Sequence, residues 1–223
     1  MSFVVAIDGP AGTGKGTVAE LIAKEMHLVK IDTGATYRCV ALAAIENGIG
    51  LEEKEKLIDL TEKLQIEIKQ EGETQKVFLN GKDVTQEIRS KEVSTIVSQV
   101  SSIVEIRLKM VDLQRKMAEG KDVIMEGRDI TTYVFPKADV KIYLDADEKE
   151  RAKRRFRENE EKGIKMSYEE VLENIRKRDK NDKEKEIGAL KIAEDAVYID
   201  TTNLCIEEVK EKVKEIIERE RGK

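Results

Sequence analysis

Histidine and tryptophan are the scarcest residues of this 223-residue sequence, which has one histidine and no tryptophan. With His27 as the sole histidine, we exclude Ser-His-Asp triads, histidine-ligated metal sites and histidine acid–base catalysis. Cys39 and Cys205 are too few for a disulfide framework, and no Cys/His spacing typical of zinc sites occurs. Aromatic residues make up only 4% of the chain, which leaves no base-stacking surface for nucleic acid.

Long apolar runs are also missing, so the sequence predicts no membrane span, and its first residues form a strand pattern rather than a secretion signal. The net charge of −5 argues against a general nucleic-acid binder. We therefore expect a cytoplasmic protein whose partners are small molecules, not nucleic acid or a membrane. A chain of 223 residues can bury a substantial core, so one domain with insertions is expected.

A glycine-rich loop is the most informative feature that the sequence does contain. Residues 9–17 read Gly-Pro-Ala-Gly-Thr-Gly-Lys-Gly-Thr and directly follow the apolar run at residues 3–7. Between a buried strand and a helix, the backbone N–H groups of such a loop converge on an anion, and Lys15 can reach the outer phosphates of a nucleotide. The alternative is a ligand-free turn, which the strand before the loop and the helix after it disfavour.

The residue after Lys15 narrows this interpretation. The commonest version of the loop has Ser or Thr there to bind Mg²⁺, whereas this chain has Gly16 and places the hydroxyl on Thr17. The Gly-Lys-Gly-Thr variant resembles nucleoside monophosphate kinases of the adenylate kinase type. In that family the metal is held largely through water and the nucleotide's phosphates.

Short apolar runs alternate with segments of helical periodicity along the chain, which predicts an α/β fold with a five-stranded parallel sheet covered by helices on both faces. Ligands bind beyond the carboxyl ends of the strands in such sheets. The polar clusters at 9–17, 32–38 and 126–129 each follow a predicted strand and should meet in one crevice. The predicted strands are residues 3–7, 28–31, 123–125, 140–144 and 197–199.

Residues 65–85 break this alternation and predict a small antiparallel β insert. Turn residues at 71–74 separate two short strand patterns, and Asn80-Gly81 is a strong two-residue hairpin signal. A long amphipathic stretch from Val93 to Val111 follows, in which the Ser101-Ser102 pair predicts a kink.

Three charged clusters could carry chemistry, and each has an alternative interpretation. Glu126-Gly127-Arg128-Asp129 offers a carboxylate, a phosphate-matching guanidinium and an acceptor for an amino group, unless Arg128 and Asp129 pair with each other. The basic helix at 151–157 predicts a mobile lid, or else a solvated helix laced with salt bridges. The run at 178–185, taken alone, is more typical of a solvated helix face. Cys39 is expected in the core.

These clusters, together with further motifs in the same order and at about the same spacing, resemble the bacterial cytidylate kinases over essentially the whole chain. The motifs are Asp-Gly-Pro at 8–10 running into the loop, Asp-Thr-Gly-Ala-Thr-Tyr-Arg at 32–38, Ser-Gln-Val at 98–100, Gly-Arg-Asp at 127–129, Val-Phe-Pro at 134–136, Lys-Ile-Tyr-Leu-Asp-Ala at 141–146 and Arg-Asp at 178–179. The β insert is also characteristic of that family.

The resemblance implies a P-loop NTPase-type fold and transfer of a phosphoryl group from ATP to CMP or dCMP, with Mg²⁺. It implies no direct metal ligand, with Thr17 and Glu126 able to act through water, and catalysis by Lys15, Arg128, Arg154 and Arg155. Cytosine would be surrounded by Thr33, Ser98, Arg107 and Asp129, the acceptor phosphate held by Arg38 and Arg128, and the ribose by Arg178 and Asp182. The ATP phosphates would lie on Gly9, Pro10, Ala11, Gly12, Thr13, Gly14, Lys15, Gly16 and Thr17.

Three positions depart from the family pattern: Lys185 replaces an arginine, Thr131 a glycine and Ala189 a proline. Lys185 can offer the acceptor phosphate only a point charge, not a bidentate contact. The resemblance further implies a monomer with one kinase domain over residues 1–223. We expect its core at 1–38, 105–148 and 165–223, an acceptor-binding insert at about 39–104 and a lid at about 149–164.

Two rival functions follow from the same sequence. A kinase of this fold could act on another acceptor, such as UMP, AMP or a small hydroxyl compound. A GTPase-like switch would need Asn-Lys-x-Asp to bind guanine, but Asn80-Gly81-Lys82-Asp83 has the wrong spacing and lies in the predicted hairpin turn.

Overall fold

A five-stranded parallel sheet forms the centre of the molecule, in a computed structural model that describes residues 2–71, 74–161 and 163–222. Its strand order is β2-β6-β1-β7-β8, and every neighbouring pair is parallel. The strands are β1 (Val4–Asp8), β2 (Val29–Asp32), β6 (Val123–Gly127), β7 (Val140–Asp145) and β8 (Val197–Asp200). The predicted sheet is confirmed, with β1 and β2 shifted by one residue, β7 and β8 one residue longer and β6 two residues longer. Asp32 and Glu126 are therefore part of strands.

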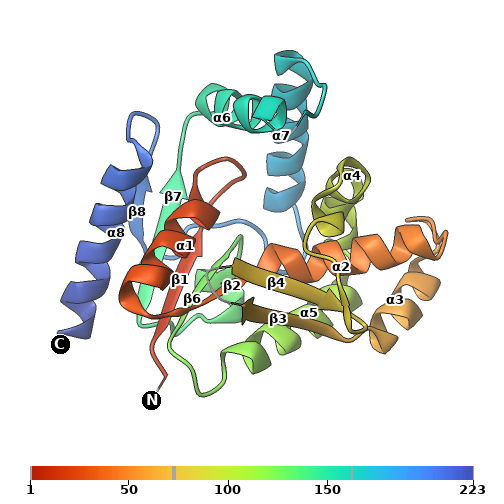
Figure 1. Cartoon of the computed structure of the whole chain (residues 1–223), viewed down its shortest axis with the longest axis horizontal. Coiled ribbons are helices and arrows are strands. Elements are labelled where there is room, and N and C mark those ends of the chain that lie inside the picture. The colour runs from red at the N-terminus through yellow and green to blue at the C-terminus, as the bar shows by residue number, and fades with distance from the viewer. Residues whose placement is uncertain (1, 72–73, 162, 223) are drawn as a thin grey trace.

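Helices cover both faces of this sheet (Figure 1). On one face, α1 (Lys15–Met26) and α8 (Ile206–Arg221) pack against the sheet, with Ile22 and Val213 fully buried. On the other, α5 (Val104–Ala118) and the short helix η2 (Ile130–Val134) cover Val4, Met125 and their neighbours. Because both faces are covered, all five residues of β1 are buried, as its apolar sequence predicts.

Residues 33–100, called the insert from here on, form a second layer beside the sheet. The insert contains α2 (Thr33–Glu46), α3 (Lys54–Lys63), the β-meander β3 (Ile66–Glu71), β4 (Thr74–Leu79) and β5 (Lys82–Asp83), η1 (Glu87–Arg89) and α4 (Lys91–Val100). Asn80 and Gly81 have φ values of 50° and 81°, which confirms the predicted hairpin turn between β4 and β5. Of the other predicted turn, at 71–74, Gly72 and Glu73 lie outside the described residues. Cys39 is buried in the core of this layer, as predicted.

The predicted kink at Ser101-Ser102 is wrong, because one long helix does not bend there. The chain instead forms two separate helices on either side of this pair. Helix α4 ends at Val100 and α5 begins at Val104. The hydroxyls of Ser101 and Ser102 both donate to the main-chain oxygen of Ser98, at 2.9 Å, which satisfies a carbonyl at the helix end.

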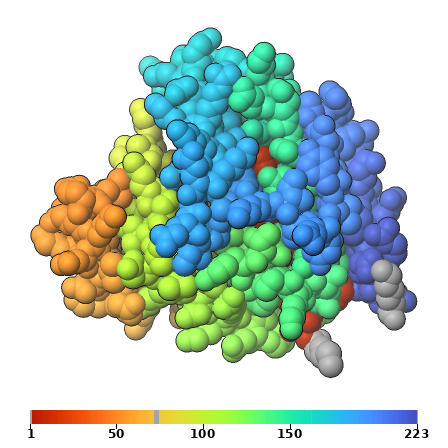
Figure 2. Space-filling view, turned by 180° about the vertical axis from the view of Figure 1, so that it is seen from behind, coloured from red at the N-terminus to blue at the C-terminus, as the bar shows by residue number. Residues whose placement is uncertain are grey.

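Helices α6 (Glu148–Glu161) and α7 (Tyr168–Lys183) form a packed pair above the carboxyl edge of the sheet, in which α6 crosses α7 (Figure 1). A capping box between Ser167 and Glu170 starts α7. The pair is joined by a small apolar core of Ala152, Val171 and Ile175. Seen from behind, the pair and the helices α2 and α3 project from the body at two different sides (Figure 2). The predicted lid, at 149–164, coincides with α6 and the turn after it, of which Lys162 lies outside the described residues.

None of the helices in the described part of the chain has the length and apolar character needed to cross a bilayer. The division into core, insert and lid stays a prediction, since α2 runs without interruption across residue 39.

Candidate active site

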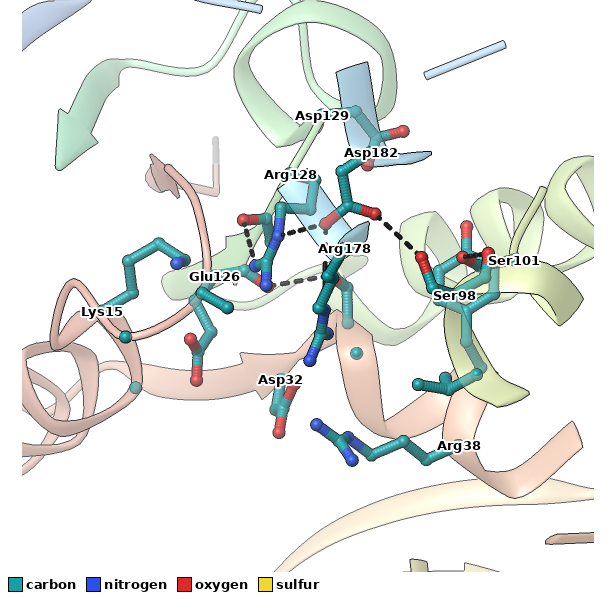
Figure 3. A pocket seen from close by; sticks show the side chains of 18 of the residues that line it. Lys15, Asp32, Arg38, Ser98, Ser101, Glu126, Arg128, Asp129, Arg178 and Asp182 are labelled. Atoms are coloured by element: carbon teal, nitrogen blue, oxygen red, sulfur yellow. Dashed lines mark hydrogen bonds and ion pairs between the residues drawn. The ribbon is translucent and has the colours of Figure 1, made fainter. Parts of the chain in front are cut away.

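A cavity of about 530 Å³ lies at the carboxyl ends of β1, β2 and β6, where the sequence places its three polar clusters (Figure 3). The sheet, the insert and the α6–α7 pair all contribute to its lining. Most of the predicted site residues meet there: Ala11, Gly12, Gly14, Lys15, Gly16, Thr17, Thr33, Arg38, Ser98, Arg107, Glu126, Arg128, Asp129, Arg155, Arg178, Asp182 and Lys185. Gly9, Pro10, Thr13 and Arg154 are not part of the lining.

The glycine loop turns sharply between β1 and α1. Gly9 has a φ of 147° and lies so close to Leu144 that any side chain would overlap its carbonyl oxygen. Gly14 caps α1 in the left-handed conformation without a side-chain cap, so the first N–H groups of α1 are left for an anion. Buried Thr13 donates to the carbonyl of Pro10 at 3.2 Å, which holds the loop together from behind.

Lys15 is buried at the floor of the loop. Its ammonium donates to the carbonyl oxygen of Pro10 at 2.6 Å and to the Thr13 hydroxyl at 3.3 Å. Burial and the nearby charge of Arg128 hold the pKa of Lys15 well below its ordinary value. A phosphate beside Lys15 would restore a partner of opposite charge to this ammonium.

Gly16 lies directly against the carboxylate of Glu126, which explains why this loop has no side chain at that position. A Cβ on Gly16 would stand 2.8 Å from Glu126 Oε1. Burial and the neighbouring charge of Asp32 raise the pKa of Glu126, and the closest compensating cation is Lys30, 3.9 Å away. The like charges of Glu126 and Asp32 in one cavity favour a bound cation.

Within the described residues, no group of three or more His, Cys, Asp or Glu side chains could hold a metal by itself. Thr17, Asp32 and Glu126 nevertheless place three oxygen-bearing side chains in the lining of the cavity. This donor set fits a hydrated Mg²⁺ that keeps several of its waters.

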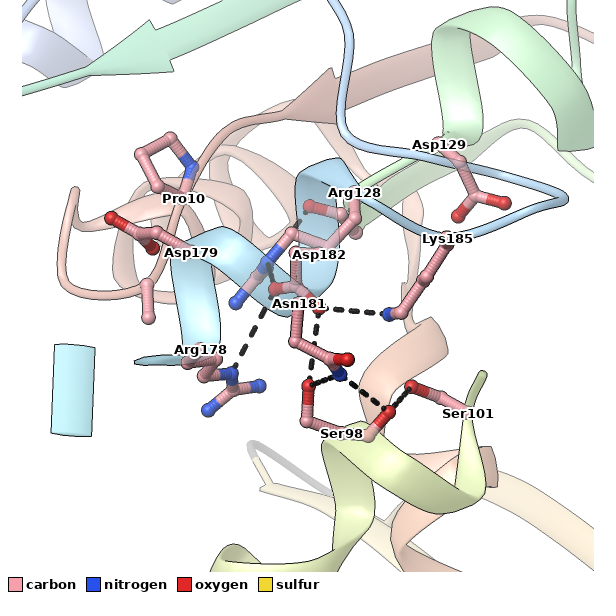
Figure 4. A network of polar contacts seen from close by, with 12 residues as sticks. Pro10, Ser98, Ser101, Arg128, Asp129, Arg178, Asp179, Asn181, Asp182 and Lys185 are labelled. Atoms are coloured by element: carbon pink, nitrogen blue, oxygen red, sulfur yellow. Dashed lines mark hydrogen bonds and ion pairs between the residues drawn. The ribbon is translucent and has the colours of Figure 1, made fainter. Parts of the chain in front are cut away.

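Asp182 is the centre of a cluster of cations on the other side of the cavity (Figure 4). Its carboxylate lies 3.0 Å from Arg128 Nε, 2.8 Å from Lys185 Nζ and 3.9 Å from Arg178 Nε. Burial alone would raise the pKa of Asp182, but Arg128, Lys185 and Arg178 hold it well below its ordinary value. Burial lowers the pKa of Arg178 to about 9, and the charge of Arg128 adds to this.

The solvated-face interpretation of the 178–185 run is therefore wrong for the three residues that line the cavity, although Lys180 and Lys183 between them are exposed. The Lys185 ammonium, with a side chain 4% exposed, is committed to Asp182. Arg128 also pairs with Asp182, so the alternative in which Arg128 pairs with Asp129 is wrong.

Asp129 pairs instead with Arg107, whose Nη2 lies 3.0 Å from Asp129 Oδ2. The Arg107 guanidinium also donates to the Tyr37 hydroxyl at 3.1 Å and to the carbonyls of Ser101 and Gly188. Burial raises the pKa of Asp129 to about 6 although Arg107 opposes the shift. Gly188, at a φ of 64°, packs so closely that a Cβ would overlap both side chains. Arg107 Nε is buried without a hydrogen-bond partner, and Asp129 Oδ2 is buried with its ion pair to Arg107 Nη2 as its charged contact.

The departure at Thr131 has a structural role. Its hydroxyl and its N–H donate to Asp8 Oδ2 at 2.6 and 2.7 Å, and the N–H of Ile130 donates to Asp8 Oδ1 at 2.9 Å. Asp8 ends β1, immediately before the glycine loop. These three bonds join that loop to the turn that carries Arg128 and Asp129.

Thr33 and Arg38 reach the cavity from α2. The Thr33 hydroxyl donates to the Glu126 carbonyl at 2.7 Å, and Arg38 donates to Ser94 Oγ at 3.2 Å. Burial lowers the pKa of Arg38, although Asp32 nearby opposes the shift. A phosphate bound beside Arg38 would therefore supply negative charge that this buried guanidinium lacks.

The two lid arginines predicted to be catalytic point in different directions. Arg155 lines the cavity and pairs with Glu158 at 2.9 Å. Arg154 donates to the carbonyl oxygen of Thr201 at 2.6 Å and to its hydroxyl at 3.2 Å. Arg151, from the same basic run, is buried and pairs with Asp179 at 2.7 Å. Arg154 and Arg151 therefore hold α6 in place, by their contacts with Thr201 and with Asp179 of α7.

Sequence patterns missed Lys30 and Arg89 as lining residues, whereas Asp32 lines the cavity as part of the predicted 32–38 cluster. Arg89 ends the short helix η1 of the insert, where no motif distinguishes it from an ordinary surface arginine. Asp32 also caps α2, because its carboxylate accepts from the Ala35 N–H at 3.2 Å.

Comparison with known proteins gives the family of the chain. The sequence model of the family described as cytidylate kinase matches residues 5–219. The cytidylate kinase of Bacillus pumilus is 47% identical over 215 residues, covering 96% of this chain and 96% of its own. That of Caldicellulosiruptor bescii is 47% identical over 212 residues, covering 95% of this chain and 94% of its own.

A crystal structure of an uncharacterized protein from Eubacterium ventriosum shares the fold, with a TM-score of 0.52 at 13% identity over 98% of this chain and 99% of that chain. The family match over nearly the whole chain and the two relatives agree with the motifs gathered in the cavity. The chain belongs to the cytidylate kinase family.

Proposed function

We propose that the protein transfers the γ-phosphoryl group of ATP to CMP or dCMP, giving ADP and CDP or dCDP. The observation that carries this is a single cavity lined by the phosphate loop on one side and by the buried Arg107–Asp129 pair on the other. The phosphate loop suits a triphosphate, and the Arg107–Asp129 pair suits a flat base with hydrogen-bonding edges.

The donor nucleotide would lie on the glycine loop at residues 9–17. Its phosphates would accept from the loop's N–H groups and from Lys15, which would give up its bond to Pro10. Thr17 and Glu126 would hold Mg²⁺ through water. When bound, Mg²⁺ neutralises charge on the phosphates.

The acceptor nucleotide would lie between Asp129 and the insert. Arg38 and Arg128 would hold its phosphate, Arg178 and Asp182 its ribose, and Thr33, Ser98, Arg107 and Asp129 its base. Asp129 Oδ2 is ion-paired with Arg107 Nη2 at 3.0 Å and keeps a further lone pair, which suits the exocyclic amino group of cytosine. Lys185 would act through Asp182, to which it is already bound.

Catalysis would depend on positioning and charge neutralisation. The attacking phosphate oxygen is already ionised near neutral pH, so the reaction needs no general base, and a chain with one histidine can perform it. Lys15, Arg128 and Arg155 would stabilise the charge on the transferring group. Because Arg154 is hydrogen-bonded to the Thr201 carbonyl, we assign it a structural role that holds α6 in position, not a catalytic one.

The protein would act as a monomer, as the resemblance to the cytidylate kinases implies. It would act in the cytoplasm, because both cysteines are free thiols, which suits a reducing compartment.

The test is a comparison of turnover with CMP, dCMP, UMP, AMP and buffer, each with ATP and Mg²⁺. We expect CMP or dCMP to give the highest kcat/KM. Faster turnover of AMP than of CMP would contradict the proposal and favour another acceptor. A switch that only binds nucleotide would turn over none of them, and the hairpin turn at Asn80-Gly81 leaves such a switch without its guanine-binding motif.

A further inference from the structure

Asn181 links the two helices that border the acceptor side of the cavity (Figure 4). It belongs to α7, and its side-chain nitrogen lies 2.6 Å from the hydroxyl oxygen of Ser98 on α4. The same nitrogen lies 3.1 Å from the Ser98 carbonyl oxygen and 3.3 Å from Ser102 Oγ. No motif or family role singles out Asn181, and the functional assignments above leave it unused.

The neighbours of Asn181 fix the orientation of its amide. The main-chain carbonyl of Ser98 can only accept a hydrogen bond, so the amide nitrogen and not the oxygen must face it. That carbonyl also accepts from the hydroxyls of Ser101 and Ser102. Asn181 is therefore a donor to the Ser98 hydroxyl oxygen, and it fills one of that oxygen's two lone pairs.

Asp182, the next residue of α7, attracts the proton of the Ser98 hydroxyl through a long contact. Asp182 lies between Arg128 and Lys185 and is held as a carboxylate, which can only accept. The Ser98 hydroxyl is 3.5 Å from Asp182 Oδ1 and donates toward it. With its proton directed to Asp182 and one lone pair bonded to Asn181, the Ser98 hydroxyl has only an acceptor position left.

We propose that Asn181 is a positioning residue for base selection, which keeps the Ser98 hydroxyl an acceptor for the amino group of the bound base. Cytosine carries an amino group at its 4-position, a donor, whereas uracil carries a carbonyl oxygen, an acceptor. An acceptor-only Ser98 therefore favours CMP and repels UMP. This inference rests on the proposed function, and it assigns to Asn181 the discrimination between the two pyrimidines.

The test measures kcat/KM for CMP and for UMP in the wild type and in Asn181→Leu, which keeps the size of the side chain and removes the donor. Without the 2.6 Å bond from Asn181, only the long 3.5 Å contact to Asp182 holds the Ser98 hydroxyl, which can then turn its proton toward a carbonyl. We therefore expect the CMP-to-UMP ratio to fall about tenfold, with KM for ATP unchanged. If Asn181→Leu fails to fold, Asn181→Ala replaces it in the test and should lower the CMP-to-UMP ratio by the same factor.

Asn174→Leu is the matched control, since Asn174 is an exposed residue of the same helix whose amide faces Met166, not the acceptor site. Its ratio should equal that of the wild type. In the Asn181→Leu background, Ser98→Ala should cause no further fall in the ratio, because the two residues act through one hydroxyl.

A wild type that does not turn over CMP would overturn the proposed function and this inference with it. A wild type that prefers CMP, with a ratio unchanged in both Asn181 variants, would overturn this inference alone. A further fall on adding Ser98→Ala would also contradict it, since Asn181 would then act independently of Ser98.

Discussion

At the scale of single residues, Lys15 carries a positive charge whose burial destabilises the fold and which would bind the phosphates of a nucleotide. We expect Lys15→Ala to lower kcat about 10²–10³-fold, the usual cost of removing one preorganised electrostatic contact. The melting temperature of the variant should not fall, because among the described residues the buried ammonium is in no ion pair within 4 Å and its desolvation is unfavourable. Steady-state kinetics and thermal unfolding measure the two effects. Lys24→Ala, an exposed lysine of the same helix, should change neither, and near-full turnover of Lys15→Ala would refute its role.

Asp129 gives a pH dependence whose sign follows from its environment. Burial raises its pKa to about 6, so below that pH the carboxyl takes up a proton and loses acceptor capacity for the cytosine amino group. We therefore expect kcat/KM for CMP, which reports the free enzyme, to fall as the pH drops through about 6. The phosphate of CMP titrates nearby, with a second pKa of about 6. Asp129→Asn separates the two, since only the substrate's titration remains in that variant. An identical pH profile in both proteins would contradict the assignment.

Sequence patterns predicted the residues whose chemistry is tied to a local motif. Lys15 follows from its loop, and Arg128 and Asp129 follow from a polar cluster after a buried strand. Asn181 and Arg89 could not be found in this way, because a polar residue on an amphipathic helix has the same spacing whether it faces solvent or a cavity. The contact of Gly16 with Glu126 also depends on two strands that are distant in sequence.

At the scale of elements, strands were predicted well because burial on both faces leaves an apolar run, as in β1 and β7. The β4–β5 turn was predicted because Asn80 and Gly81 favour positive φ. The break between α4 and α5 was not. Apolar periodicity continues across it from Val93 to Val111, and only the bonds from Ser101 and Ser102 to the Ser98 carbonyl show where the helix ends.

Helix α6 provides a prediction that sequence alone could not make, because Arg154 and Arg155 are adjacent and chemically equal. Arg155 lines the cavity, so Arg155→Ala should lower kcat roughly 10²-fold with little change in thermal stability. Arg154 bonds to the Thr201 carbonyl, so Arg154→Ala should cost about 1.5–3 kcal/mol of stability and leave kcat within a few-fold. Kinetics and denaturant unfolding of the pair measure both. The reverse pattern would show that α6 turns Arg154 into the cavity during turnover.

At the scale of the whole molecule, two parts project from different sides of the body (Figure 2), and both contribute to the lining of one cavity. Arg38 and Ser98 reach it from the insert, and Arg155 and Arg178 from the α6–α7 pair. In the described part of the chain the pair shares a core of only three buried apolar side chains, whereas the insert has a much larger core. The pair is therefore the part expected to move most readily.

Two nucleotides together would neutralise the cations that these parts bring to the cavity, and neither nucleotide alone would meet all of them. We therefore expect a non-hydrolysable ATP analogue with CMP to protect residues 150–165 from trypsin more than either ligand does alone. Mass spectrometry of cleavage after Arg155, Arg157 and Lys165 measures this. Cleavage after Lys212, an exposed residue of α8 remote from the cavity lining, is the internal control and should not change. Equal cleavage of 150–165 without ligand, with the ATP analogue, with CMP and with both would mean that α6 and α7 do not close over the nucleotides. Arg155 would then have to act from the position it already occupies beside Glu158.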